Sequence, residues 1–191
     1  MREIIPGLLW LGNAFEARDV RSVLAAGIEI IVDLAIDELP IQFPREITYC
    51  RFPLLDGEGN TPGLLRVAIN TISDFLQQKI PLLVACSGGM SRSPLLTAAA
   101  LALVRNLTFE SAINVVTKAG PHDFSPALWK DVKQFVAEQR ESSNLPRLNL
   151  VVVRSWNALR AVEFYTRIGL MFVEEQHGKG PIHWAADHGL I

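Results

Sequence analysis

Three short apolar runs, rich in Ile, Val and Leu, constrain most strongly what this chain can fold into. They are EIIVDLAID (Glu29–Asp37), TYCRFPLLD (Thr48–Asp56) and IPLLVAC (Ile80–Cys86), and each has the length and composition of a buried strand. Helical patterns separate them: residues 14–27 end on a glycine, and residues 61–78 open with a threonine and a proline, which are typical helix caps. Strands that alternate with helices predict an α/β fold with a central, mostly parallel sheet flanked by helices.

The chain divides into two parts by pattern. Three further helical patterns, 94–106, 108–118 and 126–139, follow the third strand and complete a first domain over residues 1–140. Residues 141–147 lack apolar periodicity and contain a proline, so they are predicted to be a linker. Residues 148–191 then read as a small C-terminal β-α-β-β unit. Such a unit is too small to bury much core alone, so we expect it to pack on the first domain or on a second copy of itself.

Composition narrows the class of partner. The 191 residues are 49% hydrophobic and carry a net charge of −2, with no block of like charge, so we expect neither a nucleic-acid nor a membrane partner. The longest apolar run, Pro94–Val104, is well short of the roughly 18 residues that span a bilayer. The N-terminal stretch does not read as a signal peptide. Two cysteines, Cys50 and Cys86, form no disulfide framework and suit a reducing compartment, so we expect a cytoplasmic protein.

The loop CSGGMSRS (Cys86–Ser93) carries the chemistry. It lies between a predicted buried strand and a predicted helix, where the backbone N–H groups of a glycine-containing turn can converge on one anion. Arg92 adds a planar donor fork that suits two phosphate oxygens. The same positive surroundings favour a thiolate at Cys86, which makes this residue a candidate nucleophile that forms a phosphocysteine.

This stretch resembles the signature of the cysteine-dependent protein phosphatases, most closely the dual-specificity group, whose pattern is H-C-x-x-G-x-x-R-S. The resemblance extends to residues 4–19, 31–35 and 49–56 and covers about residues 1–140. It implies that Cys86 is the nucleophile, Arg92 binds the phosphate, and Ser93 helps the cysteine leave. It also implies that Asp56 is the general acid.

Asp56 has an independent chemical argument. A leaving alkoxide or phenolate needs a proton, and a carboxyl group on a loop about 30 residues upstream can supply it and later activate water. Glu58 is its rival, with Asp33 and Asp37 further back. The alternative is that Asp56 only caps a turn before Gly57.

Ala85 departs from the family pattern, which has a histidine at this place. That histidine helps to hold the thiolate, so we expect an enzyme weakened rather than inactivated by Ala85.

The variable positions of the loop bear on the substrate. Substrate-binding positions are expected at Ser87, Gly88, Gly89, Met90 and Ser91. The variable ones among them include no Lys or Arg, which multiply phosphorylated lipid head groups would require. The expected substrate is a phosphorylated protein or a small phosphomonoester, and phosphotyrosine and phosphoserine or phosphothreonine both remain open.

Other functions stay open beside the phosphatase. A sulfurtransferase or an arsenate reductase can use a similar cysteine loop, although Ser93 and Asp56 argue against these activities. A catalytically impaired phosphate-binding or phosphopeptide-binding module is the non-enzymatic alternative. Cys50 could rescue an oxidised Cys86 if the two were close, but a buried free cysteine is the more common case.

The C-terminal unit resembles a truncated half-module of the glyoxalase/bleomycin-resistance group, the vicinal oxygen chelate superfamily. FYTRIGLMF (Phe164–Phe172) carries this likeness. Members of that group place metal ligands on the first and last strands of each module. Here Asn149 lies near the first ligand position and no last strand delivers a carboxylate, so we expect no metal and no cofactor. A packing role, ligand sensing or self-association is expected instead.

Overall fold

The computed structural model forms two compact units, Met1–Asn144 and Leu145–Ile191. It describes residues 1–144, 155–167, 169, 171–176, 178–180 and 182–186. Each unit is described by itself.

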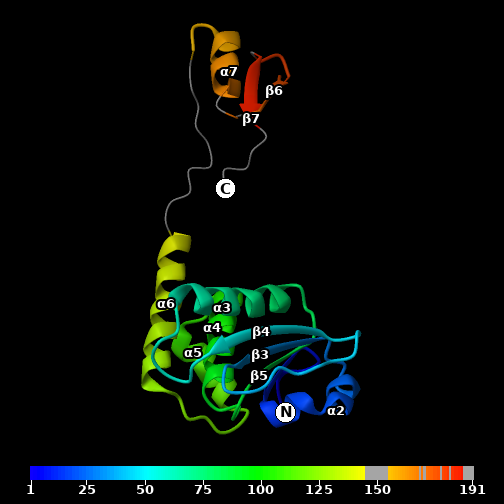
Figure 1. The fold of residues 1–191 in the computed structure, drawn as a ribbon. Coiled ribbons are helices and arrows are strands. Elements are labelled where there is room, and N and C mark those ends of the chain that lie inside the picture. The colour runs from blue at the N-terminus through cyan, green and yellow to red at the C-terminus, as the bar shows by residue number, and fades with distance from the viewer. Residues whose placement is uncertain (145–154, 168, 170, 177, 181, 187–191) are drawn as a thin grey trace. The chain divides into compact units, whose positions relative to one another are not determined.

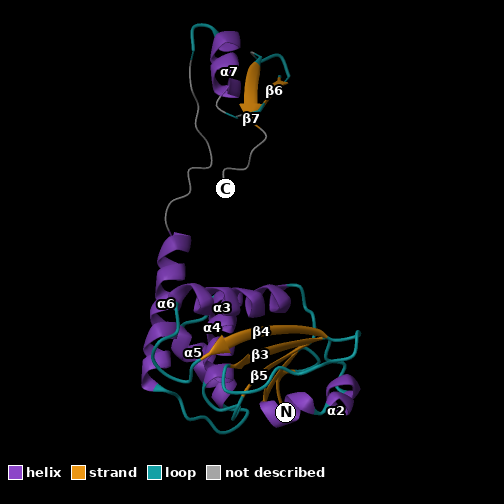
Figure 2. Cartoon of the chain, viewed as in Figure 1, coloured by secondary structure: helices purple, strands orange, loops and turns teal. Residues whose placement is uncertain are grey.

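A five-stranded mixed sheet forms the centre of the first unit (Figures 1 and 2). Its strands are β1 (Arg2–Ile5), β2 (Leu9–Asn13), β3 (Ile30–Ala35), β4 (Thr48–Leu54) and β5 (Leu82–Cys86), in the spatial order β1-β2-β5-β3-β4. The pairs β2/β5, β5/β3 and β3/β4 are parallel, and β1 is antiparallel to β2. The predicted α/β class with a mostly parallel sheet is therefore confirmed.

Six helices belong to this unit: α1 (Ala14–Arg18), α2 (Val20–Ala25), α3 (Pro62–Gln77), α4 (Arg92–Val104), α5 (Phe109–Thr117) and α6 (Pro126–Asn144). The single helix predicted over residues 14–27 is two helices, because the Asp19 side chain accepts the Ser22 N–H and starts a second helix. The predicted caps Thr61 and Pro62 of α3 are confirmed. Helix α6 continues through Asn144, so it includes part of the segment predicted as linker.

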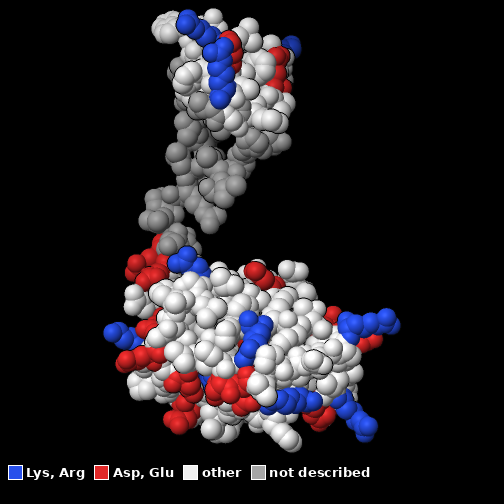
Figure 3. All heavy atoms as spheres, viewed as in Figure 1, with Lys and Arg blue, Asp and Glu red and all other residues white. Residues whose placement is uncertain are grey.

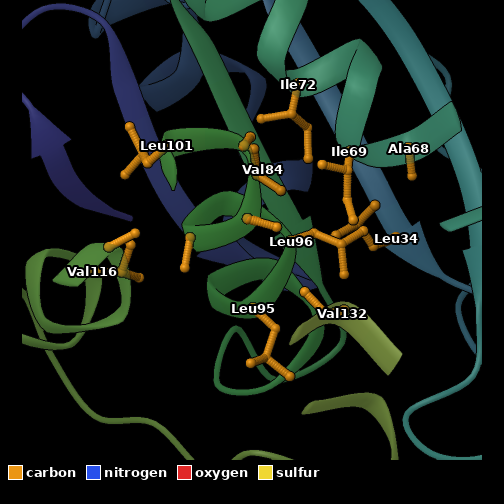
Figure 4. Close-up of a cluster of buried hydrophobic side chains, with 14 of the residues drawn as sticks. Leu34, Ala68, Ile69, Ile72, Val84, Leu95, Leu96, Leu101, Val116 and Val132 are labelled. Carbon is orange, nitrogen blue, oxygen red and sulfur yellow. The ribbon is translucent and has the colours of Figure 1, made fainter. Parts of the chain in front are cut away.

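Two apolar clusters cover the sheet. The larger one packs β2, β3 and β5 against α3 to α6, and Figure 4 shows part of it, with Leu96 of α4 beside Ile69 of α3. The smaller one contains Trp10, Val23, Ile31 and Ala85. Helix α4 is buried from Arg92 to Ala102, so the helix that follows the cysteine loop lies inside the core.

In the second unit, helix α7 (Ala158–Arg167) precedes a hairpin of β6 (Phe172–Glu175) and β7 (His183–Ala186). These three elements match the predicted helix and last two strands. The predicted first strand, residues 148–155, lies almost entirely outside the described residues. No helix in the described part of the chain is long and apolar enough to cross a membrane. On the face shown in Figure 3, charged side chains of the first unit are interspersed with uncharged surface, without an extended basic patch.

Candidate active site

The loop Cys86–Ser91 joins the carboxyl end of β5 to α4, which begins at Arg92, two residues before the predicted start at Pro94. The Cys86 side chain is buried at the base of this loop. Its Sγ accepts the Gly89 N–H at 3.2 Å and lies 3.3 Å from Ser93 Oγ. Two hydrogen-bonding groups are thus in place to stabilise negative charge on the sulfur.

Gly89 allows the loop to close this tightly. Its φ is +71°, and a Cβ built there would lie 2.9 Å from the carbonyl oxygen of Gly12. The end of β2 makes this approach because Asn13 pairs with Cys86 across the sheet, and Ala14 N–H donates to the Ser87 carbonyl at 3.2 Å. A side chain at position 89 would meet backbone, so this position requires glycine.

Arg92 is placed to bind an anion. Its side chain is 3% exposed. Nη1 donates to the Leu54 carbonyl at 3.0 Å and Nη2 donates to Ser87 Oγ at 2.8 Å. Its buried Nε has no hydrogen-bond acceptor among the described residues. A buried donor without a partner is costly, so this edge of the guanidinium would favour an acceptor such as an oxygen of an anion.

Asp37 contributes a contact that the sequence analysis missed, since it named Asp37 only as a distant rival for the acid. Its carboxylate pairs with Arg92 and accepts the Ser87 hydroxyl at 2.6 Å. The Arg92 guanidinium, together with that hydroxyl, holds the pKa of Asp37 well below its ordinary value. A carboxyl that stays ionised has no proton to give, so Asp37 orients Arg92 and does not suit the role of general acid.

Asp56 lies against the loop. Its Oδ1 accepts the Ser91 hydroxyl at 2.6 Å, and Ser91 Oγ in turn accepts the Ser125 N–H at 3.2 Å. Asp33, another of the rivals, is buried and accepts the Tyr49 hydroxyl at 2.5 Å, which is a structural role within the sheet. The structure thus brings Asp56 together with the cysteine loop, whereas no described contact joins Glu58 to it.

Arg2 also reaches the loop, and no motif pointed to it. Its Nη2 donates to the Gly89 carbonyl at 2.7 Å and its Nη1 to the Pro121 carbonyl at 2.7 Å. Arg2 therefore holds the residue whose N–H faces the Cys86 sulfur, and it joins that residue to the loop before α6.

The remaining sequence candidates are placed as follows. Ala85 is buried in the smaller apolar cluster, where it pairs with Asp33 of β3. Gly88 and Met90 are exposed at the rim of the loop. Cys50 lies on β4, two strands from β5, because both Cys50 and Val84 pair with Val32. That separation is roughly 10 Å and exceeds the span of a disulfide, so Cys50 cannot rescue Cys86 without backbone movement.

These features define a class of protein: an α/β domain with a cysteine-centred anion loop between a parallel strand and a buried helix. Among the described residues, no group of three or more His, Cys, Asp and Glu side chains could hold a metal ion.

Comparison with known proteins gives the family context. No family model matches the chain. A dual specificity protein phosphatase, Mpk3 of Drosophila melanogaster, is 33% identical over 127 residues, which cover 65% of this chain and 30% of the relative. The match thus spans less than a third of that relative's length. The matched part of the chain is similar in sequence to that dual specificity protein phosphatase.

Solved structures show the fold. Human DUSP28 matches with a TM-score of 0.67 and 21% identity over 74% of this chain and 99% of its own. A mouse putative dual specificity phosphatase, complexed with zinc tungstate, matches with a TM-score of 0.67 and 22% identity over 76% and 92% of the two chains. The first unit therefore has the dual-specificity phosphatase fold. The comparisons give no evidence for the expected glyoxalase-type half-module.

Proposed function

We propose that the first unit is a cysteine-dependent phosphomonoester hydrolase of the protein-tyrosine and dual-specificity type. One observation carries the proposal: the Cys86 sulfur, the free Nε edge of Arg92 and the Asp56 carboxyl group belong to, or contact, one loop. Together they supply a nucleophile, an anion site and a proton donor, which are the groups that phosphoryl transfer to a thiolate requires.

The residues divide the reaction into two steps. First, the Cys86 thiolate attacks phosphorus, the S–P bond forms, and the ester P–O bond breaks while Asp56 gives its proton to the leaving oxygen. Arg92 and the loop N–H groups bind the phosphoryl oxygens throughout. Second, water attacks the phosphocysteine, Asp56 takes a proton from it, and the S–P bond breaks. The Ser93 hydroxyl, 3.3 Å from the sulfur, stabilises the departing thiolate.

Hydrolysis of a small aryl phosphate by the native chain, by Cys86→Ser and by Cys50→Ser tests the proposal. We expect turnover in the native chain and in Cys50→Ser, and loss in Cys86→Ser. Phosphate or phosphopeptide binding without turnover in all three would indicate the impaired binding module instead. Sulfur transfer from thiosulfate exceeding phosphate release would indicate the sulfurtransferase alternative.

The general acid has its own test. Asp56→Asn should slow hydrolysis of an ester with a poor leaving group by about 10²- to 10⁴-fold, and an ester with a good leaving group much less. Glu58→Gln, on the same loop, is the matched control and should retain activity. Equal losses for both esters, or a larger loss in Glu58→Gln, would remove Asp56 from this role.

We further propose a weakened enzyme, because Ala85 supplies no hydrogen bond where the family pattern has a histidine. A cytoplasmic location is proposed from the two free thiols, Cys50 and Cys86. Phosphorylated proteins are the proposed substrates.

For the second unit we propose self-association. The proposal starts from the resemblance of residues 148–191 to a half-module of a class that pairs its modules. Support comes from exposed apolar side chains on this unit: Trp156, Leu159, Phe164, Met171 and Val173. Sedimentation of the full chain should show a dimer that Leu159→Ser with Phe164→Ser dissociates. A monomer at all concentrations would rule out this role.

A further inference from the structure

Large apolar side chains are exposed on the segments that surround the cysteine loop. We call them the apolar rim: Phe15, Ile36, Leu39, Leu55 and Met90. Phe15 and Leu39 are the most exposed, at 83% and 80%. Single exposed apolar residues need no explanation, but a group of them around one site is typical of a binding surface.

Hydrogen bonds place the members of the apolar rim around the loop. Phe15 follows Ala14, whose N–H donates to the Ser87 carbonyl. Ile36 and Leu39 flank the segment of Asp37, which pairs with Arg92.

The other two members are placed by the loop itself. Leu55 precedes Asp56, which accepts the Ser91 hydroxyl. Met90 lies within the loop, and its carbonyl accepts the Asp123 N–H. Four segments distant in sequence, each with an exposed apolar side chain, thus form or contact the cysteine loop and its Arg92.

The charges between these side chains are mostly negative. In segments 13–18, 36–39, 55–58, 87–91 and 121–125 the acidic residues are Glu16, Asp37, Glu38, Asp56, Glu58 and Asp123. Arg18 is the only Lys or Arg in these segments, and it pairs with Glu38 at 2.9 Å. From outside them, Arg2 donates to the Gly89 and Pro121 carbonyls, and the N-terminal amine pairs with Glu16, so acidic groups still outnumber basic ones. Arg92, behind the loop, is buried. A ligand that carries negative charge beyond its one phosphate would be repelled here.

We infer that the substrate is a phosphorylated protein segment in which large apolar residues and basic residues flank the phosphorylated residue. This inference rests on the proposed function of the loop. The apolar rim would bury the apolar neighbours of the phosphorylated residue, and the excess of negative charge around the loop would attract the basic ones. The same charges oppose acidic peptides and anionic lipid surfaces.

Affinity of the Cys86→Ser chain for labelled phosphotyrosine peptides, measured by fluorescence anisotropy, tests the inference without turnover. One peptide carries Leu, Phe and Lys around the phosphotyrosine, a second replaces Leu and Phe by Ser, and a third replaces Lys by Glu. The first should bind about tenfold tighter than either of the others, as partial burial of one large side chain or one complementary charge pair would give. Equal affinities, or tighter binding of the third peptide or of vesicles containing phosphatidic acid, would overturn the inference.

Variants locate the effect. Phe15→Ser with Leu39→Ser should abolish the advantage of Leu and Phe in the peptide, while Leu24→Ser with Val67→Ser, two exposed apolar positions outside these segments, should keep it. The same advantage in both double variants would overturn the inference. Neither pair should alter hydrolysis of a small aryl phosphate by the chain that retains Cys86. If the native chain does not hydrolyse the small aryl phosphate, the proposed hydrolase function is refuted. The peptide preference is tested separately, by the binding measurements alone.

Discussion

Gly89→Ala should weaken the Cys86 nucleophile although it changes no side chain of the loop that carries a functional group. Alanine in the left-handed region costs about 1–2 kcal/mol, and its Cβ would lie 2.9 Å from the Gly12 carbonyl oxygen. Backbone on both sides must then move apart. The Gly89 N–H would leave the position in which it donates to the sulfur at 3.2 Å.

The size of the effect on the reactivity of Cys86 follows from that single hydrogen bond. A hydrogen bond to a charged group is worth about 1.5–3 kcal/mol, and this is the stabilisation that negative charge on the Cys86 sulfur would lose. A more basic thiolate is also a better nucleophile, with a Brønsted coefficient of about 0.4–0.5. The net alkylation rate of Cys86 should therefore decrease by about 3- to 20-fold.

Alkylation by iodoacetamide at pH 6, followed by mass spectrometry of each cysteine peptide, measures this effect. Cys50 is an internal reference, since burial raises the pKa of that thiol and the change at Gly89 does not touch it. Gly88→Ala is the matched control, because a Cβ at Gly88 meets only the Met90 Cε at 3.7 Å. Equal Cys86 rates in Gly88→Ala and Gly89→Ala would refute the reasoning.

Three substitutions test the surrounding structure by urea unfolding. Asp37→Asn should lower the free energy of unfolding by about 1 kcal/mol at pH 7, a small value because Asp37 is 54% exposed. Since Arg92 lowers the pKa of Asp37, this loss of stability should shrink as the pH falls below about 4. A loss that does not change with pH would contradict the ion pair. Tyr49→Phe should cost about 1–3 kcal/mol by removing a donor from buried Asp33. The pKa of Tyr49 is raised to about 12 by burial and by that carboxylate. The difference in stability between the native chain and Tyr49→Phe should therefore disappear as the pH rises from about 10 towards that value. Ionisation of Tyr49 near pH 10 in an ultraviolet titration would argue against its contact with Asp33. Leu96→Ala, fully buried in α4, should cost about 2–5 kcal/mol, and a loss below 1 kcal/mol would mean that the core around α4 is loosely packed.

Local patterns were sufficient to predict the strands β3, β4 and β5 and the longer helices. The apolar runs around β3, β4 and β5 carry their own signal, and α3 begins at its predicted cap because Thr61 and Pro62 act within one turn. The cysteine loop could also be predicted, because its parts are consecutive in sequence. Strands β1 and β2 were missed, since a Pro-Gly pair interrupts a short apolar run and their extended form depends on pairing with β5.

The contacts of Asp37 and Arg2 depend on tertiary placement. Arg2 reaches Gly89 from the edge strand β1, and nothing near Arg2 in the sequence indicates that contact. Asp37 offered a usable signal: it comes two residues after β3, at the sheet edge where Cys86 also lies. Charged residues that directly follow the parallel strands of such a sheet can therefore be identified from the sequence alone as candidates for the same site.

The buried position of α4 determines how the anion loop can unfold. Its first residues, Arg92 and Ser93, belong to the candidate site, and the residues that follow are buried through Ala102. The anion loop thus cannot open by local fraying of a surface helix, because release of this helix exposes the centre of the first unit. Loss of phosphate binding on heating should coincide with cooperative melting of the whole unit, and a saturating oxyanion should raise the melting temperature of that transition.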